Sequence, residues 1–279
     1  MSLSLNKTEI AEKAKLLPAF PAVVSRILET IDDDNSSLGE LVEYIEHDPV
    51  ITGRVVALAN SLSLQGRHTV KMGDVYTATS LIGMSRLREV VVGLSMAEFA
   101  RAAKIETRFW EHSVSVAICA QELAESVGVS TDFAFVAGLL HDMGQLWLSR
   151  FYPAEFKAAS ALAEKAGQTI VEAETRMFGT DHCRVGYLIG ELWGLPPTVL
   201  DAILHHHHPD AEHSDKLVSI THVAEVIANA LSLGGLSGQV AYLSPAACHK
   251  LHLNFTGDLQ HLFGRMEARA EYACSIFRK

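Results

Sequence analysis

Apolar residues recur at helical spacing along most of the chain, and this pattern constrains the fold more than any other feature of the sequence. Val24, Ile27 and Leu28 lie on one such face. Residues that start helices are frequent, for example Asp48 followed by Pro49, whereas strand-like alternation over four or more residues is scarce. The sequence therefore predicts an all-α fold built from many helices.

The composition predicts a folded protein rather than a disordered one. Of the 279 residues, 48% are hydrophobic and 20% are charged, which is an ordinary balance for a globular protein. The formal net charge is −10. Because binding to nucleic acid phosphates needs clustered Lys and Arg, no nucleic acid partner is expected.

The cysteines and the apolar runs indicate the cellular compartment. Cys119, Cys183, Cys248 and Cys274 lie far apart and form no CxxC pair, so we expect four reduced thiols. The sequence has no run of about 18 apolar residues and no long apolar segment behind the first lysines. These features predict a cytoplasmic protein that does not interact with a membrane.

Breaks in the helical pattern divide the chain into three parts. We expect an N-terminal helical lobe over 1–105, packed on a second helical lobe over 106–231. A helical extension over 232–279 follows the GGLSG segment at 234–238, which is typical of a flexible loop. In the second lobe the pattern predicts helices at 110–127, 132–143, 153–166, 168–178, 181–193, 197–208 and 215–231.

Helical periodicity turns five of the 14 histidines toward the core. His112, for example, lies in line with Val116 and Cys119 at i+4 and i+7. A buried imidazole needs a hydrogen-bond partner or a metal ion. The inward-facing histidines are His112, His141, His182, His206 and His207.

Two carboxylates lie in equally apolar surroundings. Asp142 continues a row formed by Phe135 and Leu139, and an ionised Asp at that position needs compensation. Glu225 is the only charged residue of LVSITHVAEVIANAL at 217–231. A single carboxylate in such a helix requires a cation.

Each of these residues has a simpler interpretation. A single histidine on an apolar face is usually a core residue with a hydrogen bond, Asp142 can belong to a helix C-terminal turn, and Glu225 can pair with Arg184. The coincidence of all of them favours a divalent metal site, because imidazole and carboxylate ligands suit first-row divalent ions. The absence of a cysteine cluster argues against a zinc ribbon or an iron–sulfur centre.

Four segments resemble one known family. The adjacent His141-Asp142 pair in GLLHDMG resembles the dyad that gives the HD phosphohydrolase superfamily its name. HDPVITGRVVALANS at 47–61, TATSLIGMSRLREVVVGLSM at 77–96 and LWGLPPTVLDAILHHHHP at 192–209 resemble the HDOD branch of that superfamily. The resemblance covers about residues 16–230, and it implies an HD-like metal-binding lobe behind an N-terminal HDOD lobe.

The resemblance also implies a ligand set and catalytic residues. Catalysis would depend on His141 and Asp142, with Asp142 as the bridge between two metals. One or two divalent ions are implied, and iron, manganese, zinc and magnesium are not distinguished. The metal ligands carried over by position are His112, His141, Asp142, His182, His206, His207 and Glu225, the last standing where the family usually has Asp.

The chain departs from the relatives that cleave cyclic dinucleotides. In those enzymes the dyad segment commonly continues to a lysine and a GYP signature follows the paired histidines, whereas here Gln145 stands at the lysine position and no GYP occurs. Hydrolysis of cyclic di-GMP is therefore not the expected reaction.

Two functions follow from the resemblance. In the first, the protein is a metal-dependent phosphohydrolase acting on a phosphate ester or nucleotide, with Arg184 and Lys157 as candidate phosphate-binding residues. In the second, it is a catalytically silent signalling module that binds a protein partner through its N-terminal lobe. DNA binding is a distant third, because the chain has no basic recognition cluster.

Overall fold

The computed structural model describes residues 3–31, 38–65, 73–210, 215–235, 242–253 and 260–277. Within these ranges the secondary structure is helical and contains no strand, so the all-α prediction is confirmed. The helices group into two compact units, one of Phe20–Ala102 and one that joins Met1–Ala19 to Ala103–Lys279. No helix in the described ranges is long and apolar enough to cross a bilayer.

The Phe20–Ala102 unit contains five helices in its described residues. Asp48 caps the first turn of one of them by accepting a hydrogen bond from the backbone N–H of Ile51 at 3.1 Å, as its sequence predicts. Gly83, at φ 81°, separates the last two helices. The helices are α2 (Ala22–Thr30), α3 (Leu38–Glu46), α4 (Pro49–Gln65), α5 (Val75–Ile82) and α6 (Met84–Ala102).

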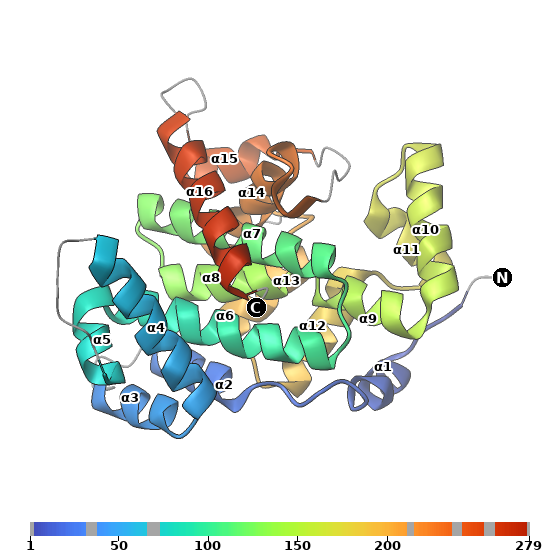
Figure 1. Ribbon diagram of the computed structural model, residues 1–279. Helices are drawn as coiled ribbons and strands as arrows, with labels where there is room; N and C mark the ends of the chain where they lie inside the picture. Colours follow the sequence, from blue (N-terminus) through green and yellow to red (C-terminus); the bar gives the residue numbers. More distant parts are fainter. Residues whose placement is uncertain are drawn as a thin grey trace. The chain divides into compact units, whose positions relative to one another are not determined.

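The second unit is built around α7 (Thr107–Val127), a helix buried on most of its circumference. Figure 1 shows α7 in green with α8, α14 and α16 beside it, and all three contact it. The other elements of the unit are α1 (Lys7–Ala14), α8 (Thr131–Leu140), α9 (Met143–Phe151), α10 (Pro153–Ala166), α11 (Ile170–Phe178), α12 (His182–Leu192), α13 (Pro197–His205), α14 (Lys216–Ala230), the 3-10 turn η1 (Leu233–Gly235), α15 (Pro245–Lys250) and α16 (Gln260–Phe277).

Burial explains the central position of α7. Val114, Ile118 and Leu123 are fully inaccessible to solvent, and each such side chain contributes about 1.5 to 3 kcal/mol to folding. Ser115 and Glu122, two polar residues of the same helix, are buried as well. Glu122 is compensated by Arg265 and Arg269 of α16, whose nearest nitrogens lie 3.0 and 2.6 Å from its carboxylate oxygens.

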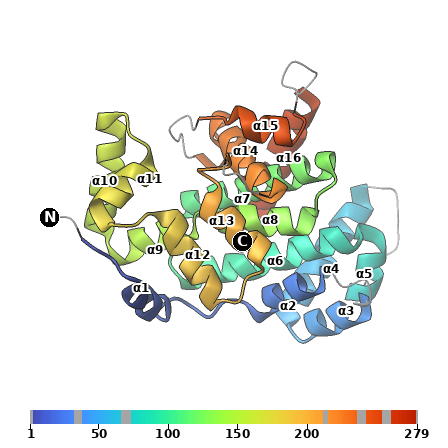
Figure 2. The ribbon, with the colours of Figure 1, turned by 180° about the vertical axis from the view of Figure 1, so that it is seen from behind.

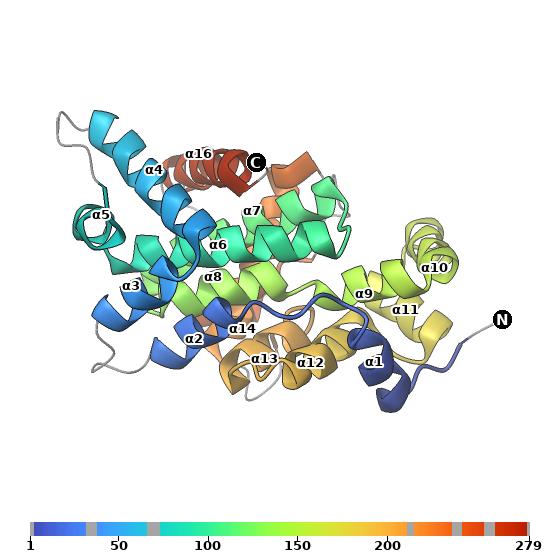
Figure 3. The same ribbon diagram turned by 60° about the horizontal axis from the view of Figure 1, so that its bottom comes forward.

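The predicted helix over 132–143 is wrong at its C-terminus. Helix α8 ends at Leu140, and a separate helix, α9, begins at Met143. The chain turns at Asp142, whose φ and ψ of −98° and 16° are not helical. A Cβ on Gly144 would lie 1.9 Å from the carbonyl oxygen of His182, so α9 and α12 cross almost backbone to backbone. Figure 3 shows this pair beside each other.

Two other predictions need correction. The helix expected over 197–208 ends at His205, and His206 is its C-terminal cap. The 234–238 segment was expected to be a flexible loop, but Gly234 belongs to η1 and packs closely on α7. A Cβ there would meet the backbone nitrogen of His112 at 2.5 Å, and its φ of 75° suits glycine. Residues 236–238 lie outside the described ranges.

Candidate metal centre

The predicted ligands converge in one place inside the second unit. His112 comes from α7, His141 and Asp142 link α8 to α9, and His182 begins α12. His206 and His207 follow α13, and Glu225 lies in the middle of α14; Figure 2 shows α12 and α13 side by side. We call the set the histidine–carboxylate cluster: His112, His141, Asp142, His182, His206, His207 and Glu225.

The two oxygens of Asp142 face different histidines. Asp142 Oδ2 lies 3.3 Å from Nε2 of His141, while Oδ1 lies 3.4 Å from Nε2 of His182 and 3.7 Å from Nε2 of His206. Asp142 is 5% exposed and the three histidines are 0% exposed. The carboxylate therefore lies between two sets of imidazoles in the buried interior of the unit.

The Nδ1 atoms of these three histidines are all anchored outside the cluster. His141 donates from Nδ1 to the carbonyl of Gly138 at 2.7 Å, and His206 donates to the carbonyl of Ile203 at 2.9 Å. His182 donates from Nδ1 to Glu174 at 2.6 Å. A neutral imidazole with its proton on Nδ1 carries a lone pair on Nε2, so each ring can present a ligand atom inward. The arrangement matches the outer hydrogen bonds that orient metal-binding histidines.

Several buried polar atoms near this point have no hydrogen-bond partner among the described residues. They include His112 Nδ1, His141 Nε2, His207 Nε2 and Glu225 Oε2. Leaving such atoms unsatisfied costs about 1 to 3 kcal/mol each. Bound divalent cations would offer these atoms partners, and the donor set of nitrogen and carboxylate oxygen suits first-row divalent ions.

His222 is a useful contrast because it is also buried. Its Nδ1 donates to the carbonyl of His206 at 2.8 Å, and its Nε2 accepts from the backbone N–H of Ser244 at 3.1 Å. Both ring nitrogens are therefore used within the protein, and His222 is a core histidine of the ordinary kind. The simpler interpretation of a buried histidine applies here and not to the histidines of the cluster.

The electrostatics of the cluster favour ionised carboxylates. Burial raises the pKa of Asp142, but His141, His206 and His182 lower it well below its usual value. Burial likewise raises the pKa of Glu225, and the charges of His207, His206 and His141 bring it below the usual value. Burial lowers the pKa of His207 to about 3. Two ionised carboxylates in this interior favour a positive charge between them.

Three further residues contact the cluster, and the sequence analysis assigned none of them to it. Glu174 of α11 is 0% exposed and accepts from both the ring and the backbone of His182. It lies in a helical row with Ile170 and Phe178, the same signal that identified Asp142. Cys183 lies beside His182 with its Sγ 3.5 Å from Nε2, and Gln145 donates to Asp142 Oδ1 at 3.1 Å.

Arg184 and Lys157, two candidate phosphate-binding residues, do not contact the histidine–carboxylate cluster among the described residues. Arg184 is exposed on α12 and lies over the Tyr187 ring at 5.1 Å, and Lys157 is exposed on α10. The described contacts include no pair between Arg184 and Glu225. Glu225 instead lies close enough to His207 and His206 for their charges to lower its pKa.

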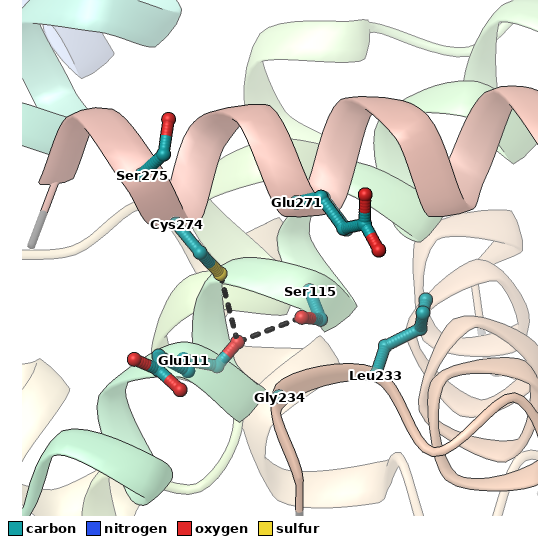
Figure 4. A pocket seen from close by; sticks show the side chains of 8 residues that line it. Glu111, Ser115, Leu233, Gly234, Glu271, Cys274 and Ser275 are labelled. Carbon is teal, nitrogen blue, oxygen red and sulfur yellow. Dashed lines mark hydrogen bonds between the residues drawn. The ribbon is translucent and has the colours of Figure 1, made fainter.

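A separate small cavity lies between α7, η1 and α16. Its volume is about 260 Å³, and Figure 4 shows its wall, in which Ser115 Oγ and Cys274 Sγ both donate to the carbonyl of Glu111 at 2.7 and 3.7 Å. None of the cluster residues lines it. The full lining is Glu111, Ser115, Leu233, Gly234, Ala270, Glu271, Cys274 and Ser275.

Comparison with known proteins places the chain in a family. The HDOD domain model matches residues 17–209. An uncharacterized protein of Treponema pallidum (strain Nichols) is 21% identical over 202 residues, which cover 71% of this chain and 39% of the relative, so the chain spans about two fifths of that protein.

Solved structures resemble the chain over almost its whole length. An HDOD domain protein of unknown function from Geobacter sulfurreducens has a TM-score of 0.76 at 25% identity, covering 96% of this chain and 97% of the other. A candidate phosphohydrolase from Shewanella amazonensis SB2B has a TM-score of 0.71 at 25% identity, with the same coverage. A candidate signal transduction protein from Marinobacter aquaeolei VT8 shares the fold, with a TM-score of 0.74 at 21% identity over 99% of this chain and 63% of the other. Together with the matching motifs and the helical architecture, these similarities show that the chain belongs to the HDOD domain family.

Proposed function

We propose that this HDOD protein holds one or two divalent metal ions in the histidine–carboxylate cluster and uses them to hydrolyse a phosphate ester. The observation that carries the proposal is the set of three anchored histidines, each with Nε2 within 3.3 to 3.7 Å of an Asp142 oxygen. The Shewanella candidate phosphohydrolase, with its similar fold, supports the same reaction class.

The geometry divides the ligands around Asp142. His112, His141 and Asp142 have potential ligand atoms within 4.8 Å of one another, and His182, His206 and His207 belong to a second such group. Asp142 would serve both groups, since one oxygen faces His141 and the other faces His182. Glu225 would add negative charge from α14.

When bound, a divalent ion supplies polarisation of a phosphoryl oxygen and a lowered pKa for a coordinated water. The protein's own contribution is orientation. Gly138, Ile203 and Glu174 hold the three Nδ1 protons, so that His141, His206 and His182 keep their rings in place. Burial of the cluster strengthens every electrostatic contact within it, because the local dielectric constant is low.

The proposed substrate is a phosphate ester or a nucleotide, without a finer assignment. Arg184 and Lys157 are exposed and make no recorded contact with the cluster, so the structure supplies no separate argument for them as phosphate ligands. The cyclic dinucleotide reading stays disfavoured, because an uncharged Gln145 contacts Asp142 at the position where those relatives carry lysine.

A second function is supported by a different observation. His141, His182 and His206 are 0% exposed, as in a structural metal site whose ligands enclose the ion. In this alternative the metal stabilises a signalling module that binds a protein partner and turns over no substrate. Cytoplasmic signalling of this kind remains a proposal alongside the hydrolase.

Elemental analysis of tag-free protein, purified without chelator or nickel resin, tests both functions. We expect near-stoichiometric iron, manganese or zinc that is lost in His141→Ala and Asp142→Ala proteins of normal helicity. His208→Ala is the matched control, since His208 is exposed in the same histidine run, and it should keep its metal.

The outcomes separate the alternatives. Metal binding together with hydrolysis of chromogenic phosphate esters, both lost in the two variants, supports the hydrolase. Metal binding without turnover of any phosphate ester supports the signalling module. Protein that stays metal-free after reconstitution with each of these ions overturns the metal centre.

A further inference from the structure

Four side chains from two helix ends form a group with ligand spacing. His182 and Cys183 begin α12, and His206 and His207 follow α13. One potential ligand atom from each lies within 4.8 Å of the others. His207 Nε2 is buried and has no hydrogen-bond partner among the described residues. The group therefore contains a ring nitrogen that is available as a metal ligand, as well as a thiol.

The separations match those of a tetrahedral zinc site. Zinc ligand bonds of about 2.0 to 2.1 Å to nitrogen and about 2.3 Å to sulfur place two nitrogens about 3.4 Å apart, and a nitrogen and a sulfur about 3.6 Å apart, at the tetrahedral angle. The distance from His182 Nε2 to His206 Nε2 is 3.4 Å, and the distance from His182 Nε2 to Cys183 Sγ is 3.5 Å. Both values agree with shared coordination of one ion.

The thiol is buried beside the imidazoles of the subsite. Cys183 is 4% exposed, and its recorded contacts are with imidazole nitrogens, His182 Nε2 at 3.5 Å and His206 Nδ1 at 4.0 Å. The thiolate is the form of cysteine that binds metal.

We propose that Cys183 is a thiolate ligand of the subsite formed with His182, His206 and His207, and that this subsite takes a zinc ion. The inference rests on the proposed metal centre and specifies one part of it. The other group, His112, His141 and Asp142, offers only nitrogen and oxygen. The two subsites therefore differ in chemical softness, and a soft thiolate selects zinc over magnesium or manganese.

Cobalt(II) titration of the metal-free full-length protein tests the proposal. Bound cobalt gives visible d–d absorption whatever its ligands, whereas a cobalt–thiolate bond adds intense charge-transfer absorption in the near ultraviolet. We expect both signals in the wild-type protein, and we expect Cys183→Ala to lose the charge-transfer band and to bind zinc at least about tenfold more weakly.

Cys119→Ala is the matched control. Cys119 is a second fully buried thiol, and burial raises its pKa to about 12, so it stays protonated and belongs to neither ligand group. This variant should keep the full charge-transfer band. Cys183→Ser, which keeps the size and polarity of the side chain, serves if Cys183→Ala does not fold, and it should also lack the band.

The results distinguish this proposal from the proposed function. Visible d–d absorption without a charge-transfer band in the wild-type protein overturns the Cys183 assignment and leaves the metal centre standing. A band that persists in Cys183→Ala or Cys183→Ser also overturns it. A charge-transfer band in protein that hydrolyses no phosphate ester supports Cys183 and rejects the hydrolase, while absence of any cobalt absorption overturns both.

Discussion

One carboxylate oxygen of Glu174 accepts two hydrogen bonds from His182, one from ring Nδ1 at 2.6 Å and one from the backbone N–H at 2.9 Å. Both residues are inaccessible to solvent. A single side chain on α11 therefore fixes both the ring orientation of His182 and the start of α12. The second carboxylate oxygen, Oε1, has no hydrogen-bond partner among the described residues.

The Glu174→Gln substitution should weaken metal binding about 10- to 100-fold while the helix content stays unchanged. The amide oxygen can still accept from His182, but the negative charge that makes Nε2 a stronger ligand is lost. Competition titration with a chromogenic zinc chelator measures the effect. Glu164→Gln, an exposed change on the neighbouring α10, should have no effect, and equal affinity in both variants would contradict the orienting function of Glu174.

Removing the Gln145 amide should leave the Asp142 carboxylate less firmly oriented. Gln145→Ala deletes the 3.1 Å hydrogen bond to Asp142 Oδ1, so the carboxylate loses its fixed orientation. We expect metal affinity to fall about tenfold, equivalent to about 1.4 kcal/mol. Calorimetric titration of metal into the apo protein checks this value. An unchanged affinity would mean that the neighbouring histidines alone hold Asp142.

Gly144→Ala should destabilise the protein because of the close crossing of α9 and α12. The added Cβ would lie 1.9 Å from the carbonyl oxygen of His182, and backbone must move to relieve the clash. We expect a loss of about 3 kcal/mol or more in the free energy of unfolding. Gly264→Ala on α16, where nothing lies within 4 Å of the added Cβ, should be neutral or stabilising by up to about 1 kcal/mol. Urea denaturation of both variants gives the comparison.

Metal binding should stabilise the fold, because the unfolded chain does not hold the ligand residues together and therefore does not bind the ion in the same way. With metal at about 100 times its dissociation constant, the gain is about 2.7 kcal/mol, which corresponds to a rise of roughly 5 to 10 °C in Tm for a chain of this size. Thermal unfolding with added zinc and with excess chelator measures it. Asp142→Ala should unfold at the same temperature in both conditions, and a zinc-induced rise in that variant would place the binding elsewhere.

Helical spacing in the sequence predicted the fold class and the inward direction of the cluster residues. Residues three or four apart on one helix share a face, so Phe135 and Leu139 predict the inward direction of Asp142. Asp142 is buried in the structure, although α8 has already ended at Leu140. The predicted inward direction of the Asp142 side chain is correct although the predicted helix end is wrong, because His141 keeps helical backbone angles and only Asp142 departs from them.

The parts that sequence reasoning missed depend on contacts between helices. Glu174 and Cys183 acquire their significance from His182 and His206, and no spacing rule within one helix relates α11 and α12 to the end of α13. The close crossing of Gly144 and α12 is likewise a contact between two helices. The N-terminal α1 was also missed, because its weak apolar pattern is stabilised by tertiary packing rather than by its own sequence.

Helix α1 contacts residues that lie far from it in the sequence. Lys7 of α1 pairs with Glu191 of α12 at 3.4 Å, and Glu9 accepts a hydrogen bond from Tyr152. The intervening residues include the whole Phe20–Ala102 unit. At about 5 to 20 residues per second, the ribosome needs roughly 10 to 40 seconds to travel from Lys7 to Glu191. Helix α1 is therefore synthesised well before the α12 surface that it contacts, and the Phe20–Ala102 unit can form its own contacts in the interval.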